Sequence, residues 1–183
     1  MKITRIYITG FMGSGKSTLG PIVANTIGWN SYDIDSEIEK RTGMKVTEIF
    51  KSKGEKFFRE LESSILDEHS KELEVVVSLG GGTIAYNNNF DIIKKTGVLV
   101  YLKSSPEKIF LRLKHKTDRP LFQTFDNLIL SDEEALQKIK RLLSEREKYY
   151  RNADIIIDID GISVGRTVDR LVRELKKKFQ IVN

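Results

Sequence analysis

The chain has 183 residues, which suits one domain spanning 1–183, and it carries 31 basic against 26 acidic residues for a formal net charge of +5. It has no cysteine, so disulfides and thiolate metal sites are excluded and a cytoplasmic protein is the default expectation. The sequence has no signal-peptide core, no run near the ~18 apolar residues of a membrane span and no nucleic-acid recognition motif. We therefore expect it to bind neither a membrane nor nucleic acid.

Predicted strands and helices alternate along the chain. Short β-branched runs predict strands at residues 5–10, directly before Asp33, and at 74–82, 97–102 and 153–159. Apolar residues three and four positions apart predict helices at residues 16–28, 36–43, 56–69, 105–114, 133–150 and 168–179. This alternation predicts an α/β fold, a three-layer, doubly wound parallel sheet with ligands beyond the carboxyl ends of its strands. The weakly periodic residues 114–131 are expected to form a mobile lid.

The first predicted strand leads into a glycine-rich segment, "GFMGSGKS". Its Gly10, Gly15, Lys16 and Ser17 fit the pattern of a phosphate-binding loop, between a strand and a helix as that motif requires. Glycines let backbone N–H groups turn toward phosphate oxygens, and the following helix adds its positive end. Lys16 is expected to contact the β and γ phosphates of a nucleoside triphosphate and Ser17 to ligate Mg²⁺. The alternative is a glycine-rich turn without a ligand.

The predicted nucleotide-binding segment continues into the first helix. It comprises Gly13, Ser14, Gly15, Lys16, Ser17 and Thr18. The Thr18 side chain is expected to serve the helix more than the ligand.

Two acidic residues follow the second predicted strand, in "YDIDSEIEKRTG". Asp33 and Asp35 would point to the same side if the strand continued, so that one could serve the metal and the other a substrate hydroxyl. The competing interpretation is helix capping, because acidic residues favour the first turn of a helix. Both interpretations stay open at this point.

Arginines and glycines are candidates for the site that binds the phosphoryl acceptor, the molecule that receives the phosphoryl group. Arg59, in "GEKFFRELE", can hold a carboxylate or phosphate through two parallel hydrogen bonds, or form a helical ion pair with Glu62 or Glu55. The glycines at 80–82 would expose backbone donors to a closely approaching ligand, or form a plain turn.

Three later arginines are Arg112, Arg119 and Arg146. Arg119, within the predicted lid, could move over the transferring phosphoryl group and offset its charge. Any one of these arginines, taken alone, would more often be a solvated surface residue. The interpretation of the three as ligand-binding residues therefore rests on their occurring together.

The combined pattern resembles the shikimate kinases over nearly the whole chain. The resemblance is carried, in order and spacing, by "GFMGSGKST", "YDIDSEIEKRTG", "EIFKSKGEKFFRELE", "SLGGGT", "DRPLF" and "EREKYYRNAD". It implies a fold similar to that of nucleoside monophosphate kinases. It also implies transfer of the γ-phosphoryl group of ATP to the 3-hydroxyl of shikimate, giving shikimate 3-phosphate and ADP in chorismate and aromatic amino-acid biosynthesis.

The resemblance implies a role for each matching residue. Substrate binding would fall to Asp35, Arg59, Gly80, Gly81, Gly82 and Arg146, within and beyond a substrate-binding region at about 33–62. In this set Asp35 would hold the shikimate hydroxyls, and Arg59 and Arg146 would grip the carboxylate. Catalysis would involve Lys16, Asp35 and Arg119.

The same resemblance implies which residues bind Mg²⁺, close the lid and contact the adenine. Asp33 would assist Mg²⁺ through water, Arg119 would close with the lid, and Arg112 would stack against adenine. A monomer is expected.

One departure from the family pattern and three rival functions stay open. The family commonly has Pro-Leu-Tyr shortly after its second carboxylate-binding arginine, whereas Arg146 is followed by "EKYY", with Tyr150 at the expected offset. Arg141 or Arg151 is therefore an alternative to Arg146. The rival functions are phosphorylation of gluconate, phosphorylation of a nucleoside monophosphate, and a regulatory module that has lost the chemistry.

Overall fold

The computed structural model describes residues 2–114 and 130–181. Most of the predicted lid, with Arg119, lies outside the described residues. The central element is a five-stranded parallel sheet of β2 Arg5–Thr9, β3 Asn30–Asp33, β4 Val75–Ser78, β5 Val98–Lys103 and β6 Ile155–Asp158. The strand order is β3-β4-β2-β5-β6, so the chain builds the sheet first on one side of β2 and then on the other. This order confirms the predicted doubly wound α/β fold.

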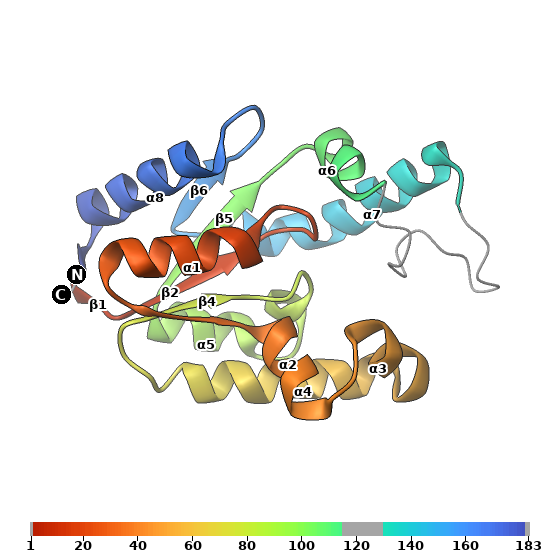
Figure 1. The fold of residues 1–183 in the computed structure, drawn as a ribbon, viewed down its shortest axis with the longest axis horizontal. Helices are drawn as coiled ribbons and strands as arrows, with labels where there is room; N and C mark the ends of the chain where they lie inside the picture. The colour runs from red at the N-terminus through yellow and green to blue at the C-terminus, as the bar shows by residue number, and fades with distance from the viewer. Residues whose placement is uncertain (1, 115–129, 182–183) are drawn as a thin grey trace.

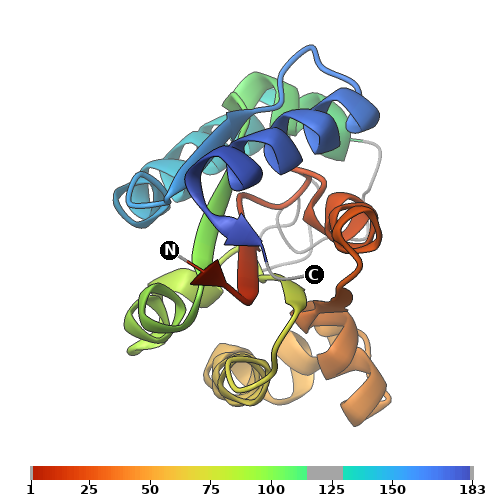
Figure 2. The same ribbon diagram turned by 90° about the vertical axis from the view of Figure 1, so that its left-hand side faces the viewer.

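Helices cover both faces of the sheet (Figures 1 and 2). The helices are α1 Lys16–Ile27 and α8 Val164–Lys178 on one face, and α4 Gly54–His69, α5 Asn89–Thr96 and α7 Asp132–Tyr150 on the other. Successive strand residues point to opposite faces, so Ile6 and Ile8 pack toward α1 and α8 whereas Tyr7 packs into the other layer. Burial of both faces explains why the strand sequences are almost continuous apolar runs.

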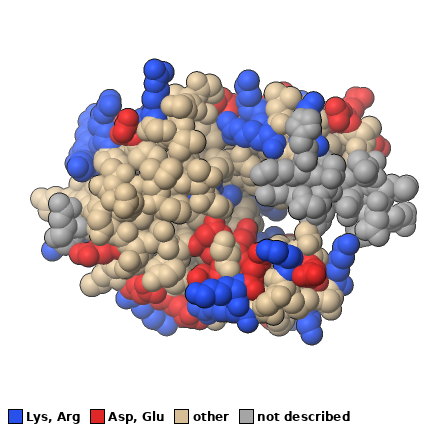
Figure 3. Space-filling model, viewed as in Figure 1, with Lys and Arg blue, Asp and Glu red and all other residues tan. Residues whose placement is uncertain are grey.

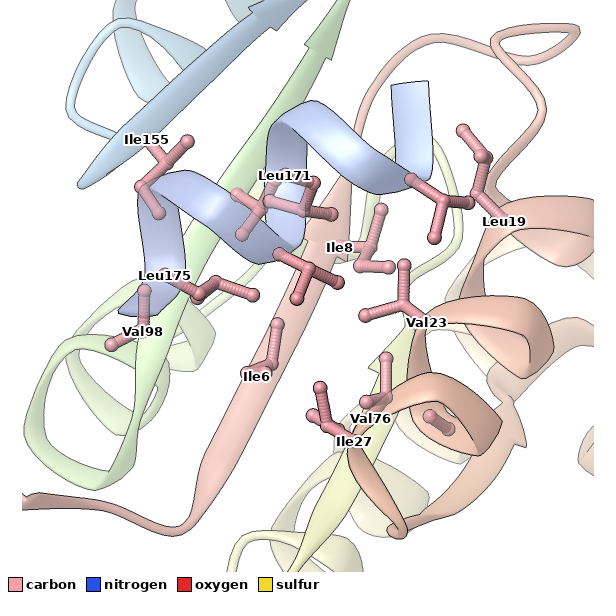
Figure 4. Close-up of a cluster of buried hydrophobic side chains, with 14 of the residues drawn as sticks. Ile6, Ile8, Leu19, Val23, Ile27, Val76, Val98, Ile155, Leu171 and Leu175 are labelled. Atoms are coloured by element: carbon pink, nitrogen blue, oxygen red, sulfur yellow. The ribbon is translucent and has the colours of Figure 1, made fainter. Parts of the chain in front are cut away.

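The core between α1, α8 and the sheet holds the first helix in place (Figure 4). Ile6 and Ile8 of β2 share this cluster with Val23 of α1 and Leu171 of α8, and all four side chains are fully buried. Apolar burial of this kind contributes roughly 1.5–3 kcal/mol for each large side chain. The loop that precedes α1 is therefore anchored at the carboxyl end of the sheet.

Smaller elements complete the described chain. They are α2 Ile34–Thr42 and α3 Val46–Ser52 before α4, a 3-10 turn η1 Thr83–Ala85 after β4, and α6 Pro106–Leu113 after β5. A separate pair of two-residue strands, β1 Lys2–Ile3 and β7 Gln180–Ile181, runs parallel and brings the two ends of the described chain together (Figure 1). The sequence patterns did not predict α3, η1, α5, β1 or β7.

The surface mixes both signs of charge. In the face that Figure 3 shows, Lys and Arg lie near Asp and Glu around the edge and below the centre, while a broad area between them carries neither. No helix within residues 2–114 and 130–181 is long and apolar enough to span a bilayer.

Candidate nucleotide and acceptor site

The predicted phosphate-binding loop joins β2 to α1. Gly13 and Gly15 have φ angles of 78° and 87°, in the left-handed region that favours glycine. A Cβ atom on Gly13 would also lie 2.9 Å from the side chain of Leu113 in α6. Gly15 is the N-cap of α1, so the positive end of that helix faces the loop. The backbone thus has a geometry suited to binding phosphate.

Lys16 keeps its ammonium group within the loop. Its Nζ donates to the carbonyl oxygens of Gly10 at 2.9 Å and Phe11 at 3.2 Å, and the side chain is buried. The hydroxyl of Ser78, at the end of β4, donates to the carbonyl oxygen of Lys16 at 3.1 Å. This contact links the loop to the strand that leads into the three glycines.

The hydroxyl residues beside Lys16 differ in exposure. Ser14 is buried, and its Oγ has no hydrogen-bond partner among the described residues. Ser17 and Thr18 are exposed in the first turn of α1. Buried hydroxyls are normally paired, so an unpaired Ser14 Oγ suits a loop that receives a further polar group.

Asp33 and Asp35 do not share a strand. β3 ends at Asp33, whose carboxylate accepts a hydrogen bond from the N–H of Ser36 at 3.0 Å and caps α2. Asp35 lies in the first turn of that helix. The expectation of a shared side from strand alternation is therefore wrong, because capping ends the strand, and the capping interpretation is confirmed for Asp33.

Asp35 nevertheless points toward the glycine segment. Its Oδ1 is buried, has no hydrogen-bond partner within the described part of the chain, and would lie 2.9 Å from a Cβ atom on Gly80. Burial raises the pKa of Asp35 to about 6; repulsion from Glu62 also raises it, whereas Lys16 and Arg59 lower it. Asp35 can thus accept a hydrogen bond or a proton from a ligand hydroxyl.

Arg59 forms both of the ion pairs considered from the sequence. Its Nη1 donates to Glu62 at 2.5 Å and its Nη2 to Glu55 at 3.0 Å. The pair with Glu62 is not a solvated surface contact, because 12% of the Arg59 side chain and 0% of the Glu62 side chain are exposed. Glu62 also accepts from the hydroxyl of Thr83 at 2.5 Å, which connects α4 to the segment after the glycines.

The three glycines form a turn directly beyond β4, which ends at Ser78 and not at Gly82. A Cβ atom added to Gly80 would lie 2.0 Å from Oε1 of Glu62. One added to Gly81 would lie 3.4 Å from Nη1 of Arg146, and one added to Gly82 would lie 2.6 Å from Nη2 of Arg59. The missing side chains therefore allow two guanidinium groups and a carboxylate to approach one turn.

Arg146 reaches this turn from α7. Its guanidinium lies over the Phe11 ring, 5.5 Å from the centroid, in addition to its approach to Gly81. Tyr150, one helical turn further on, is fully buried and donates its hydroxyl to the carbonyl oxygen of Gly81 at 2.7 Å. The end of α7 is therefore fixed directly to the glycine turn.

The two alternative arginines point elsewhere. The Arg141 side chain is 70% exposed and lies 3.9 Å from Glu145, whereas that of Arg151 is 75% exposed and lies 3.2 Å from Glu147. Both contacts are intrahelical or helix-terminal pairs that face solvent. The geometry favours Arg146 as the partner of Arg59.

Arg112 lies in the last turn of α6, on the phosphate-loop side of the site. Its Nη1 donates to the hydroxyl of Ser104 at 3.1 Å, and its Nη2 lies 3.7 Å from Oδ1 of Asp160. The side chain is 36% exposed, which leaves part of the guanidinium accessible to a ligand.

The site thus has a phosphate side and an acceptor side. Figure 3 shows the surface hollowed between the phosphate-binding loop and α3. Among the described residues, no three His, Asp or Glu side chains converge as metal ligands. Mg²⁺ normally needs only one or two protein ligands beside phosphate oxygens and water, and the donor types of Ser17 and Asp33 suit it.

Sequence reasoning missed the depth at which Glu62 lies. It weighed Glu62 only as a surface partner of Arg59, although the residue is the buried centre of contacts with Arg59 and Thr83. The Arg-x-x-Glu spacing indicated the first contact. The second depends on the fold and has no sequence signal.

A phosphate-binding loop between the central strand and the first helix of a doubly wound parallel sheet, facing a compact acceptor site, defines a P-loop kinase. A family model described as shikimate kinase matches residues 12–176. The shikimate kinase of Chlorobaculum parvum is 45% identical over 177 residues, which cover 97% of this chain and 95% of the relative. The chain belongs to the shikimate kinase family, and the family predicted from its motifs is confirmed.

Solved structures agree with this assignment. A 1.7 Å crystal structure of the Bacteroides thetaiotaomicron shikimate kinase superposes with a TM-score of 0.86 at 34% identity, covering 94% of this chain and 98% of that chain. The Acinetobacter baumannii shikimate kinase in complex with shikimate also has a TM-score of 0.86, at 31% identity over 97% of this chain and 96% of that chain.

Proposed function

We propose that this member of the shikimate kinase family transfers the γ-phosphoryl group of ATP to the 3-hydroxyl of shikimate, using the two sides of the site just described. One observation carries the proposal: Arg59, Arg146 and the unpaired Oδ1 of Asp35 all approach the glycine turn. Shikimate is a small hydroxylated ring with one carboxylate. It therefore needs a basic clamp for the carboxylate and a hydrogen-bond acceptor for its hydroxyls.

The phosphate side holds the nucleotide. Backbone N–H groups of residues 13–18 and the positive end of α1 would surround the phosphate oxygens, and Lys16 would exchange its carbonyl partners for the β and γ phosphates. Arg112 would stack on the adenine. When bound, Mg²⁺ would neutralise charge on the β and γ oxygens, held by Ser17 directly and by Asp33 through water.

The acceptor side orients shikimate. Arg59 and Arg146 would grip the carboxylate, and the glycines at 80–82 leave room for the ring to approach the backbone. Asp35 would accept the hydrogen of the reacting hydroxyl and set its oxygen in line with the γ phosphorus. Transfer through a loose transition state needs mainly this positioning and charge neutralisation.

The lid contribution is part of the proposal, although Arg119 lies outside the described residues. Following the family resemblance, Arg119 would offset charge on the transferring group when the lid at about 114–131 closes. An Arg119→Lys variant should lower kcat while leaving the KM for shikimate nearly unchanged.

The direct test is ADP release by the purified protein with ATP and Mg²⁺, supplied in turn with shikimate, gluconate, AMP or no acceptor. We expect turnover with shikimate alone. Turnover only with another acceptor would overturn the assigned substrate, and nucleotide binding without turnover would point to a regulatory module.

The role of Asp35 has its own test. An Asp35→Asn variant should lose about 10²–10⁴-fold in kcat if the carboxylate takes the proton in the transition state. Normal turnover by this variant would rule out Asp35 as the group that accepts the proton. An Arg141→Lys variant is a suitable control, because Arg141 faces solvent and the proposal gives it no role.

A further inference from the structure

A partly buried hydrogen-bond chain joins three elements beside the proposed adenine position. Ser104 follows β5, Arg112 ends α6, and Asp160 follows β6. Arg112 donates to the hydroxyl of Ser104 at 3.1 Å, and that hydroxyl donates to Oδ1 of Asp160 at 2.5 Å. The second oxygen of Asp160 accepts from the N–H of Ser105 at 2.9 Å.

The direction of this chain follows from the chemistry of its members. A guanidinium can only donate and an ionised carboxylate can only accept, whereas a hydroxyl has a single hydrogen. Ser104 can accept from Arg112 with a correctly oriented lone pair because its hydrogen is committed to Asp160. Ser104 is 4% exposed, so water does not readily replace either partner.

Asp160 is itself held firmly. Its N–H donates to Oδ1 of Asp158 at 3.0 Å, and the N–H of Ile159 donates to the carbonyl oxygen of Lys103, extending the pairing of β5 and β6. Burial acts to raise the pKa of Asp160, but hydrogen bonds from Ser104 and Ser105, together with the charge of Arg112, outweigh it and lower the pKa below its ordinary value. The carboxylate is therefore ionised at neutral pH and lies 3.7 Å from Nη2 of Arg112.

The chain lies next to the phosphate-binding loop. Leu113, the neighbour of Arg112, is the side chain that a Cβ atom on Gly13 would meet at 2.9 Å. The carbonyl oxygen of Leu102, two residues before Ser104, would lie 2.8 Å from a Cβ atom on Gly10. The helix that carries Arg112 therefore packs directly against the phosphate-binding loop.

We propose that Asp160, acting through Ser104, is a positioning residue that holds the Arg112 guanidinium in place for stacking on the nucleotide base. Arg112 has a long side chain that is 36% exposed, so without these partners it would occupy several rotamers. Fixing it in advance lowers the entropy cost of nucleotide binding. This inference rests on the proposed function, because it assumes that Arg112 contacts the base.

The test compares a ligand that has the base with one that lacks it. Dissociation constants for ADP and for tripolyphosphate are measured by titration with the wild type, Asp160→Asn and Ser104→Ala. We expect both variants to bind ADP about 5–10-fold more weakly and to bind tripolyphosphate as the wild type does, since the phosphate-binding loop is unchanged. Equal weakening of both ligands, or no change in either, would overturn the proposal.

A double-mutant cycle checks that Asp160 acts through Arg112. Arg112→Ala should weaken ADP binding, and adding Asp160→Asn should then cause no further loss. Additive losses would contradict the proposed route. Asp169→Asn is the matched control, because it removes one exposed carboxylate charge on α8 that has no part in this network, and it should leave ADP affinity unchanged.

Two further measurements distinguish a loss of Arg112 positioning from a general disturbance of the enzyme and from failure of the proposed function. In the Asp160→Asn enzyme, the KM for ATP should rise while kcat and the KM for shikimate stay near wild-type values. A fall in kcat together with a rise in both KM values would indicate a general disturbance and count against positioning. If the wild type itself binds no ADP, the proposed function fails first, and the two failures are distinguished.

Discussion

The carboxyl group of Asp35 occupies a position where its charged form is disfavoured. Burial is the main cause and Glu62 the second, and together they outweigh the attraction of Lys16 and Arg59. Because the folded-state pKa is about 6 against an ordinary 3.8, the folded protein binds this proton more tightly than the unfolded chain does. The free energy of unfolding should therefore decrease as pH rises from about 4 through 6.

Because the charged form of Asp35 lowers the stability of the folded protein, removing the charge should stabilise the protein although it lowers kcat. Asp35→Asn should raise the free energy of unfolding of the ligand-free protein by up to about 3 kcal/mol at pH 7.5, because two pKa units correspond to that amount. The gain should shrink as pH falls from about 6 to about 4, because the buried wild-type carboxyl becomes neutral at the upper end of this range and the carboxyl of the unfolded chain at the lower end. Urea unfolding at several pH values measures it, and a gain that is independent of pH would contradict this account.

The three glycines differ in what a methyl group would meet, and their alanine variants should differ accordingly. Gly82→Ala should raise the KM for shikimate at least tenfold, since its Cβ would meet all three terminal guanidinium atoms of Arg59 within 2.8 Å. Gly81→Ala should have a smaller effect, because its closest neighbour is Arg146 at 3.4 Å. Steady-state kinetics on both variants, with Tm measured alongside, tests this order; equal effects would contradict it.

At the scale of whole elements, long periodic segments were predictable, whereas short ones were predicted only in part. The expected helices at 16–28, 56–69 and 133–150 correspond to α1, α4 and α7 with small shifts at their ends. Helices α3 and α5, of seven and eight residues, were missed, whereas α6, also of eight residues, was predicted from its apolar spacing. β1 and β7 have two residues each and form only because the fold brings them together.

The element boundaries also explain how much of the candidate site was predictable. The motifs placed Lys16 at the start of a helix and Arg59 within a helix, as the structure has them. The glycines at 80–82 were expected to end a strand, but they follow β4 as a turn. The position of Asp35 was predicted by the wrong route, since the strand ends at Asp33 and a helix begins. The buried contact of Glu62 with Thr83 joins residues 21 apart and could not be read from spacing.

The end of α7 gives a prediction at this scale. Tyr150→Phe removes the hydrogen bond that fixes α7 to the carbonyl oxygen of Gly81 and leaves that oxygen without its partner. We expect the free energy of unfolding to fall by about 1–2 kcal/mol and the KM for shikimate to rise, since Arg146 lies one turn earlier on the same helix. A loss of stability with an unchanged KM would show that the two residues are independent.

At the scale of the whole molecule, the phosphate and acceptor sides are built from different helices on one sheet. α1 and α6 surround the phosphate-binding loop, whereas α2, α4 and α7 supply Asp35, Arg59 and Arg146. A ligand that binds only the folded state stabilises it by about 2.7 kcal/mol at a hundredfold excess over its Kd. ADP bound on the phosphate side and shikimate bound on the acceptor side should therefore each stabilise the folded protein independently.

Thermal shifts can show this separation. Shikimate and ADP should each raise the Tm of the wild type. In Arg59→Lys, which cannot form two parallel hydrogen bonds to a carboxylate, the shift with shikimate should largely disappear and the shift with ADP should remain. Loss of both shifts would mean that the two sides are not separable.

The parallel pairing of β1 with β7 has a consequence for engineering. Both ends of the described chain lie together at one end of the molecule, away from α3 and α6 (Figure 1). A short flexible linker between the ends should therefore yield a circular permutant with a new opening in the exposed turn at Lys71, distant from the phosphate-binding loop. Such a rearranged chain would retain phosphotransfer, because the linker joins β7 to β1 on the side of the sheet away from the phosphate-binding loop.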